Sequence, residues 1–145
     1  MVPVRVRVKI KSLMGLNPVA SIETCSLLNT GYTGASPEVI LPAKLAEKLG
    51  FWPPPNESVE STYDTAGGLA RFYAIRGAAL LQVVEEDVTS RGLDTVISPI
   101  EREVLLSDFV IGEMGVIILN AYKGFWRFES DPPERVRHEK RPEFW

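Results

Sequence analysis

Cysteine and histidine are nearly absent from this chain, since Cys25 and His138 are the single examples among 145 residues. One cysteine cannot form an internal disulfide, and its position in an apolar run favours a small buried hydrophobic side chain. A zinc site would have to consist mostly of carboxylates, which is unusual for zinc. We therefore expect no metal and no cofactor.

Long hydrophobic runs are also missing. No apolar stretch approaches the ~20 residues that a membrane-spanning helix needs, and the sequence shows no signal-peptide pattern. The net charge of -3 gives no electrostatic reason to expect nucleic acid or an anionic membrane as a partner. We expect a cytoplasmic domain that binds neither.

The basic side chains that do cluster, between Arg5 and Lys11, alternate with apolar ones. This period of two predicts a strand with one charged face, and exposed charges also discourage edge-to-edge pairing of strands. A solvated face is the favoured interpretation, and a binding patch is the alternative.

The remaining composition, 45% apolar and 24% charged residues, is that of one globular domain. Short strand-like segments separated by turns predict a mostly β barrel or sandwich. A turn is expected over 14–18 and a kink at Gly77. The expected strands cover residues 4–11, 19–28, 39–42, 69–77, 78–84, 93–97, 104–106, 116–119 and 125–128.

Two short helices interrupt the strands. Pro42–Gly50 has proline near its start and glycine at its end, and leucines at positions 41, 45 and 49 form one apolar stripe. The second helix is expected over 109–114, with Ser107-Asp108 as its cap and Gly115 as its end. The tail over 131–145 is expected to be either a flexible terminus or an arm that orders against a partner, such as a dimer contact.

The segment that bears on chemistry is Leu27-Leu28-Asn29-Thr30-Gly31, an apolar strand that leads Asn-Thr-Gly into a turn. Asparagine and glycine are common in ordinary turns. With aspartate at position 29, however, the triplet would be Asp-Thr-Gly. Aspartic peptidases use two close carboxylates that share one proton, one as base for a water and one as acid.

Three more segments follow in a specific order: Val39–Pro42 with its helix, Thr65-Ala66-Gly67-Gly68, and Val104–Leu106 before Ser107. Together with the Asn29 triplet, over about residues 19–128, this order resembles the small retropepsin-like (retroviral-type) aspartic proteases. The resemblance includes their stand-alone archaeal and bacterial members.

The resemblance implies a retropepsin-like closed β-barrel over residues 1–130 with one active-site loop per chain. It places Asn29 at the position of the catalytic aspartate, beside Thr30 and Gly31, and makes Thr65–Gly68 a flap over the substrate. A complete dyad then needs two chains, so the resemblance implies a homodimer whose cleft lies at the twofold axis. The expected partners are peptide or protein substrates in extended form.

Two residues depart from the family pattern. Ser107 replaces the usual glycine after the apolar pair, where it can cap the helix that follows. Asn29 has the larger consequence, because an amide cannot take a proton from water. Loss of general acid–base action costs on the order of 10²–10⁴ in rate, so the chain as written is expected to be inactive.

Asp64-Thr65-Ala66 is a second near match to the protease triplet. The preceding Ser61-Thr62-Tyr63 is too polar for the buried strand that the triplet requires, and Ala66 lacks the freedom of glycine. We assign this segment to the flap, where Tyr63, Phe72 and Tyr73 are candidate substrate contacts, although strand aromatics more often belong to a core.

Three functional hypotheses follow. The first is an aspartic endopeptidase whose natural residue 29 is aspartate, seen here as an inactivated variant. The second is a natural pseudo-protease that binds extended peptides by strand-like pairing without cutting them. The third is a non-enzymatic β-barrel interaction module.

Overall fold

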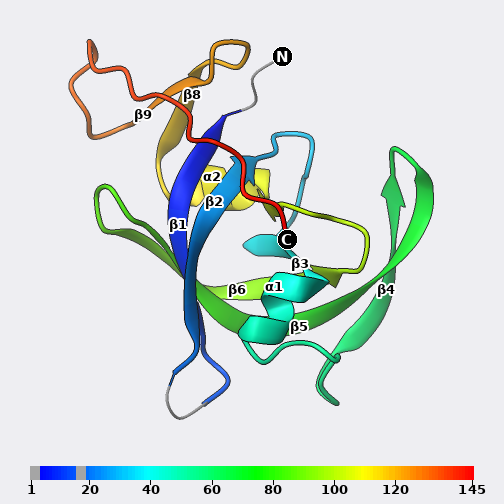
Figure 1. The fold of residues 1–145 in the computed structure, drawn as a ribbon. Helices are drawn as coiled ribbons and strands as arrows, with labels where there is room; N and C mark the ends of the chain where they lie inside the picture. Colours follow the sequence, from blue (N-terminus) through cyan, green and yellow to red (C-terminus); the bar gives the residue numbers. More distant parts are fainter. Residues whose placement is uncertain (1–3, 16–18) are drawn as a thin grey trace.

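The computed structural model describes residues 4–15 and 19–145 (Figure 1). The turn expected over 14–18 therefore falls partly on residues 16–18, outside the described residues. The strands are β1 Arg5–Ser12, β2 Ser21–Leu28, β3 Glu38–Pro42, β4 Val59–Thr65, β5 Gly68–Val83, β6 Val88–Ser98, β7 Val104–Leu106, β8 Val116–Asn120 and β9 Phe125–Phe128. The helices are α1 Ala43–Lys48 and α2 Asp108–Glu113.

Six of these strands form a closed barrel in the order β1-β2-β7-β3-β6-β5, and pairing of β1 with β5 closes it. The pairs β2/β7 and β3/β6 are parallel, and the other neighbours are antiparallel. Closure leaves the barrel strands without a free edge. The expectation of a mostly β closed barrel with two short helices is confirmed.

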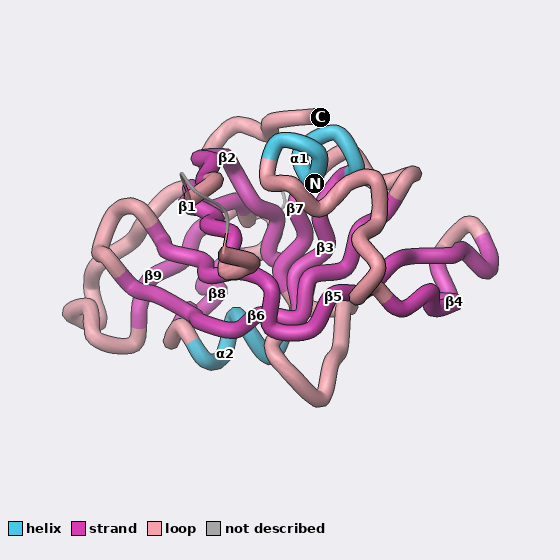
Figure 2. Tube along the Cα trace, turned by 90° about the horizontal axis from the view of Figure 1, so that it is seen from below, coloured by secondary structure: helices cyan, strands magenta, loops and turns pink. Residues whose placement is uncertain are grey.

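Strand β4 lies outside the barrel and, among the described strands, pairs only with β5. The two form a hairpin that projects from the body of the molecule (Figures 1 and 2). The second half of β5 returns to the barrel. The bend is near Gly77, which has a φ of 58°, where the β5/β6 register shifts between Ile75 and Ala79. The predicted kink is confirmed, but the two strands expected over 69–77 and 78–84 are one bent strand.

The main core fills the barrel interior, where Val6, Val8 and Ile10 of β1 are fully buried. The leucines at positions 41, 45 and 49 are also fully buried, so the predicted apolar stripe packs α1 and its flanks onto the core. A second, smaller apolar cluster is formed by Ile40, Phe72, Val96 and Leu105.

The charged face of β1 is present as predicted, but its two arginines are ion-paired. Arg5 contacts Glu103 at 2.6 Å, and Arg7 contacts Glu23 at 2.6 Å and Glu143 at 2.5 Å. These pairs link β1 to the loop before β7 and to the C-terminal tail, which makes part of this face structural.

The tail over 131–145 crosses the outside of β1 and β2 (Figure 1). Buried Arg137 contacts Asp131 at 2.8 Å and Glu86 at 2.6 Å. At the other end, the Trp145 backbone N–H donates to the carbonyl of Arg102 at 2.8 Å. The tail is therefore ordered against its own chain, and a contact with a partner stays a prediction.

Among the described residues, no helix combines the length and the apolar character that crossing a bilayer would require.

Candidate active site

The Asn29 turn begins where β2 ends. The Asn29 N–H donates to the carbonyl of Leu106 in β7 at 3.2 Å, and its carbonyl accepts the Tyr32 N–H at 3.0 Å. The side-chain oxygen Oδ1 accepts the Gly31 N–H at 3.1 Å, which closes an Asx-type turn. Asn29 is half-buried, whereas Thr30 and Gly31 are exposed. The turn thus presents residue 29 at the surface while fixing its backbone.

The start of α2 holds the far side of this turn. The Asp108 N–H donates to the carbonyl of Tyr32 at 2.9 Å, and Asp108 Oδ1 accepts the Gly34 N–H at 3.1 Å. Asp108 lies in the first turn of α2, where a carboxylate is also favoured by the helix dipole.

Ser107 acts as the cap that its position predicted. Its buried Oγ accepts the Val110 N–H of α2 and the Glu38 N–H of β3, both at 3.4 Å. Its own N–H donates to the carbonyl of Glu38 at 3.3 Å. Serine in place of glycine therefore adds a side-chain link between α2 and β3.

The segment expected to be the flap forms the tip of the β4–β5 hairpin. Thr65 pairs with Gly68, and Ala66 and Gly67 make the connection. Gly68 has a φ of 107°, a backbone conformation that L side chains rarely adopt. The Asp64-Thr65-Ala66 near match thus lies on the hairpin, and the Asn-Thr-Gly triplet lies at the barrel.

One cavity of about 450 Å³ joins these two elements. We call it the Asn29 cavity, and it takes residues from the Asn29 turn, β3, the hairpin, the β6–β7 loop and β7. Its lining is Asn29, Gly31, Tyr32, Thr33, Ile40, Asp64, Ala66, Phe72, Glu101 and Leu105. The sequence-predicted positions 29, 31 and 66 are therefore brought together. Of the other predicted positions that the structure describes, Thr30 and Gly68 are not part of this lining.

The lining of the Asn29 cavity includes both apolar and acidic side chains. Three members of the second apolar cluster, Ile40, Phe72 and Leu105, line it. Asp64 and Glu101 add two carboxylates. Burial, assisted by the charge of nearby Glu103, raises the pKa of Glu101 above its ordinary range.

Of the aromatic residues expected to contact substrate, Phe72 lines the Asn29 cavity. Tyr73 points elsewhere: its ring packs edge-on against Trp52 at 5.6 Å between centroids, beside the main core. The side chain of Tyr63 is outside what the structure describes. Sequence reasoning missed Tyr32 and Glu101, and the only signal for Tyr32 was its position next to the triplet.

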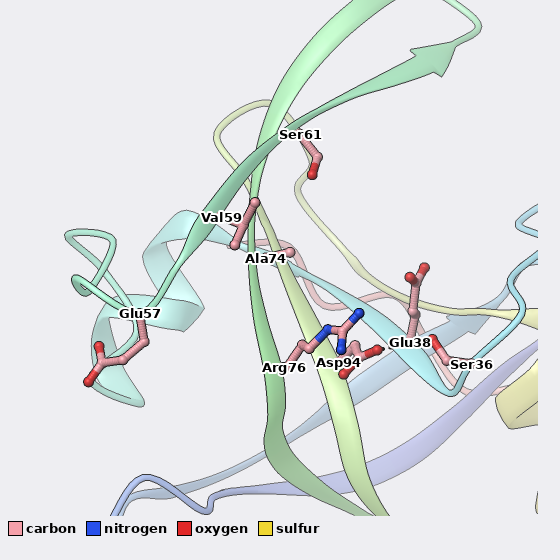
Figure 3. Close-up of a pocket in the computed structure, with 8 residues that line it drawn as sticks. All are labelled: Ser36, Glu38, Glu57, Val59, Ser61, Ala74, Arg76 and Asp94. Atoms are coloured by element: carbon pink, nitrogen blue, oxygen red, sulfur yellow. Dashed lines mark hydrogen bonds between the residues drawn. The ribbon is translucent and has the colours of Figure 1, made fainter.

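A second cavity of about 400 Å³ takes residues from β3, β4, β5 and β6 and from the loops before β3 and β4 (Figure 3). Its lining is Ser36, Glu38, Glu57, Val59, Ser61, Ala74, Arg76 and Asp94, and we call it the Arg76 cavity. Asp94 accepts hydrogen bonds from Ser36 Oγ at 3.0 Å and from the Gly77 N–H at 2.9 Å. At least one acidic side chain of the Arg76 cavity, that of Asp94, therefore already accepts hydrogen bonds from within the protein.

The described residues contain no group of three or more His, Cys, Asp or Glu side chains placed to hold a metal ion. Cys25 is buried in β2, as its apolar surroundings predicted. The chemistry available at the Asn29 cavity is thus that of carboxylates, an amide and backbone donors.

No protein-family model and no curated protein matches this chain.

Proposed function

We propose that this chain is a retropepsin-type aspartic endopeptidase that acts as a homodimer on extended peptides, and that Asn29 keeps it inactive as written. The observation that carries the proposal is the shared cavity: the Asn29 turn and the tip of the β4–β5 hairpin line the same space. A loop at the base and a hairpin above are what a peptide cleft with a flap requires.

The local geometry suits a carboxylate at position 29. The Gly31 N–H already donates to Asn29 Oδ1, and it would donate equally to a carboxylate oxygen. Two such carboxylates at a twofold axis would share one proton, so that one activates water and the other protonates the leaving amine. An amide can hold the hydrogen bonds but cannot take the proton.

Exposed apolar side chains beside the cavity support the contact with a second chain that the homodimer requires. Leu69, which pairs with Asp64 on the hairpin, is 78% exposed, and Ile100, which precedes Glu101, is 62% exposed. Large exposed apolar side chains beside a cavity are typical of an interaction site. A twofold dimer with Thr30 and Gly31 near its axis would bring two such sites together.

The test is to restore the carboxylate. We expect Asn29→Asp to cleave an unfolded protein at acidic pH, to bind a pepstatin-type inhibitor, and to run as a dimer at micromolar concentration. Asn120→Asp makes the same chemical change in a turn outside the cavity, where Asn120 Oδ1 accepts the Lys123 N–H, and should stay inert. A folded, dimeric Asn29→Asp protein with neither cleavage nor inhibitor binding would refute the endopeptidase.

The pseudo-protease is the second candidate, because the Asn29 side chain is already accommodated in its turn without any carboxylate. It requires peptide binding by the chain as written and no cleavage by Asn29→Asp. A strict monomer that binds no peptide would leave the β-barrel interaction module.

A further inference from the structure

The Asn29 cavity presents an apolar surface and negative charge to whatever enters it. Ile40, Phe72 and Leu105 supply the apolar part, and Asp64 and Glu101 supply the charge. Among the residues that the structure describes, no lysine or arginine lines this cavity. A ligand group that suits both parts has an apolar stem and a cationic end.

The Glu101 carboxylate has no cationic partner among the described residues. Glu101 is half-buried, and its carboxylate makes no hydrogen bond or ion pair with any described residue, although its backbone N–H donates to Ser98 Oγ at 3.0 Å. The neighbouring acid, Glu103, is held by Arg5 through contacts of 2.6 and 3.1 Å. Both contacts of Arg5 therefore go to Glu103. The negative charge of Glu103 in turn acts on Glu101 and raises its pKa.

Burial and Glu103 both raise the pKa of the Glu101 carboxyl, which is the direction expected of an acid that lacks a cation. A cation arriving from outside would reverse this effect. The favourable partner is therefore a positive charge brought by the ligand.

We propose that the Asn29 cavity selects a lysine or arginine side chain of an extended peptide, with the stem on Ile40 and Leu105 and the cation at Glu101. This specificity rests on the proposed function, in which the cleft receives extended peptides. Asp64, on the hairpin, supplies the second negative charge and keeps the cation near the flap.

The Arg76 cavity does not share this preference. Its lining contains a cation, Arg76, together with Asp94 and Glu38 (Figure 3). Tyr32, Ser36 and the Gly77 N–H already donate to these carboxylates. A cation from a ligand is therefore favoured at the Asn29 cavity and not at its neighbour.

The chain as written is suited to a binding test, because it is expected to hold peptides without cutting them. Labelled extended octapeptides that differ only at one central position, carrying lysine, arginine, norleucine or glutamate, are titrated with the full chain and followed by fluorescence anisotropy. A hydrogen-bonded charge pair predicts at least about fivefold tighter binding of the lysine and arginine peptides than of the norleucine peptide. The glutamate peptide should bind most weakly.

Two charge-removing variants locate the source of the preference. Glu101→Gln should reduce the lysine-to-norleucine ratio to about twofold or less, and Asp64→Asn should reduce it partly. Glu47→Gln changes the net charge equally on the exposed side of α1 and should leave the ratio unchanged. Asp64 is exposed, Glu101 is half-buried without a side-chain hydrogen bond among the described residues, and both substitutions are isosteric, so folding should be retained.

The outcomes separate this inference from the proposed function. Equal affinity for lysine and norleucine peptides, or a preference that survives in Glu101→Gln, overturns the inference while peptide binding stands. Cleavage by Asn29→Asp with no enrichment of basic residues near the cut bonds also overturns the inference, while the proposed function stands. No binding of any peptide, together with an inert Asn29→Asp protein, removes the proposed function and the inference with it.

Discussion

The phenolic hydroxyl of Tyr32 donates a hydrogen bond of 2.7 Å to Glu38 Oε2. Tyr32 lines the Asn29 cavity and Glu38 lines the Arg76 cavity, so this bond lies in the wall between them. The backbone of Glu38 is in turn paired with Ser107. The residue after the Asn-Thr-Gly triplet is thus fixed to β3 and, through it, to α2.

Tyr32→Phe removes this bond and should lower the free energy of unfolding by about 0.5–1.5 kcal/mol. Urea denaturation measures the change. Tyr122→Phe is the matched control, because Tyr122 is 69% exposed. Equal stability of the two variants would mean that the Tyr32–Glu38 bond contributes nothing net.

Ser107→Ala should destabilise the protein by about 1 kcal/mol, because the Oγ that caps α2 is lost. Ser107→Gly should cost only a few tenths of a kcal/mol, since glycine is a tolerated N-cap. Thermal unfolding of the two variants gives the order. Both variants lose Oγ, so a worse result with glycine would mean that the buried Cβ and the backbone entropy at position 107 outweigh the capping preference.

Asp131→Asn weakens the ion pair with buried Arg137 and should cost about 1–3 kcal/mol at neutral pH. Arg137 holds the pKa of Asp131 far below its ordinary 3.8. This stabilisation is fully present above the unfolded pKa and is lost as pH falls toward the folded one. Denaturant curves at pH 7 and pH 3 should therefore show a smaller difference between variant and parent at pH 3.

Glu101→Gln should change stability in the opposite direction. The folded pKa of Glu101 is raised, so its ionised form opposes folding above the unfolded pKa and has no effect well below it. We expect a gain of about 0.5 kcal/mol or less at pH 7, because the side chain is only half-buried and solvent screens its charge, and no gain at pH 3. A stabilised variant that binds lysine peptides less well would identify Glu101 as a residue kept for binding. A loss of stability at pH 7 would contradict this role.

Cys25 should react slowly with thiol reagents. It is 3% exposed, and burial together with the nearby Glu143 raises its pKa. Deleting residues 141–145 removes Glu143 and also Trp145, whose Nε1 donates to Thr24 Oγ1 at 3.1 Å, and should accelerate alkylation at least several-fold. Glu143→Gln lowers the pKa but leaves Trp145 in place, so it separates charge from access. Equal rates in the parent and the deletion would show that the tail does not shield Cys25.

Local patterns predicted the elements that are determined locally. The alternation in β1, the cap at Ser107 and the bend at Gly77 each depend on residues close in sequence. Strand β4 was missed because it is polar and pairs on one side only, outside the barrel. Its β-branched residues, such as Val59 and Thr62, were the available signal.

The site could be predicted only in part. Phe72 and Tyr73 were both expected at the substrate, yet neighbours in a strand face opposite sides, so one cavity could not take both. Glu101 reaches the cavity because β7 inserts between β2 and β3, and that arrangement joins segments distant in the chain. Sequence spacing alone does not predict such a contact.

Contacts from distant parts of the chain help to fix the Asn29 turn. The Gly34–Asp108 bond joins residues 74 positions apart, and the Asn29 N–H is held by Leu106. The side chain at position 29 contributes one acceptor to its own turn, which a carboxylate provides as well as an amide. Gain or loss of the acidic group is therefore a single-codon step that leaves the scaffold unchanged. If the proposed function holds, a lineage carrying this fold needs one substitution to change between cutting and holding peptides.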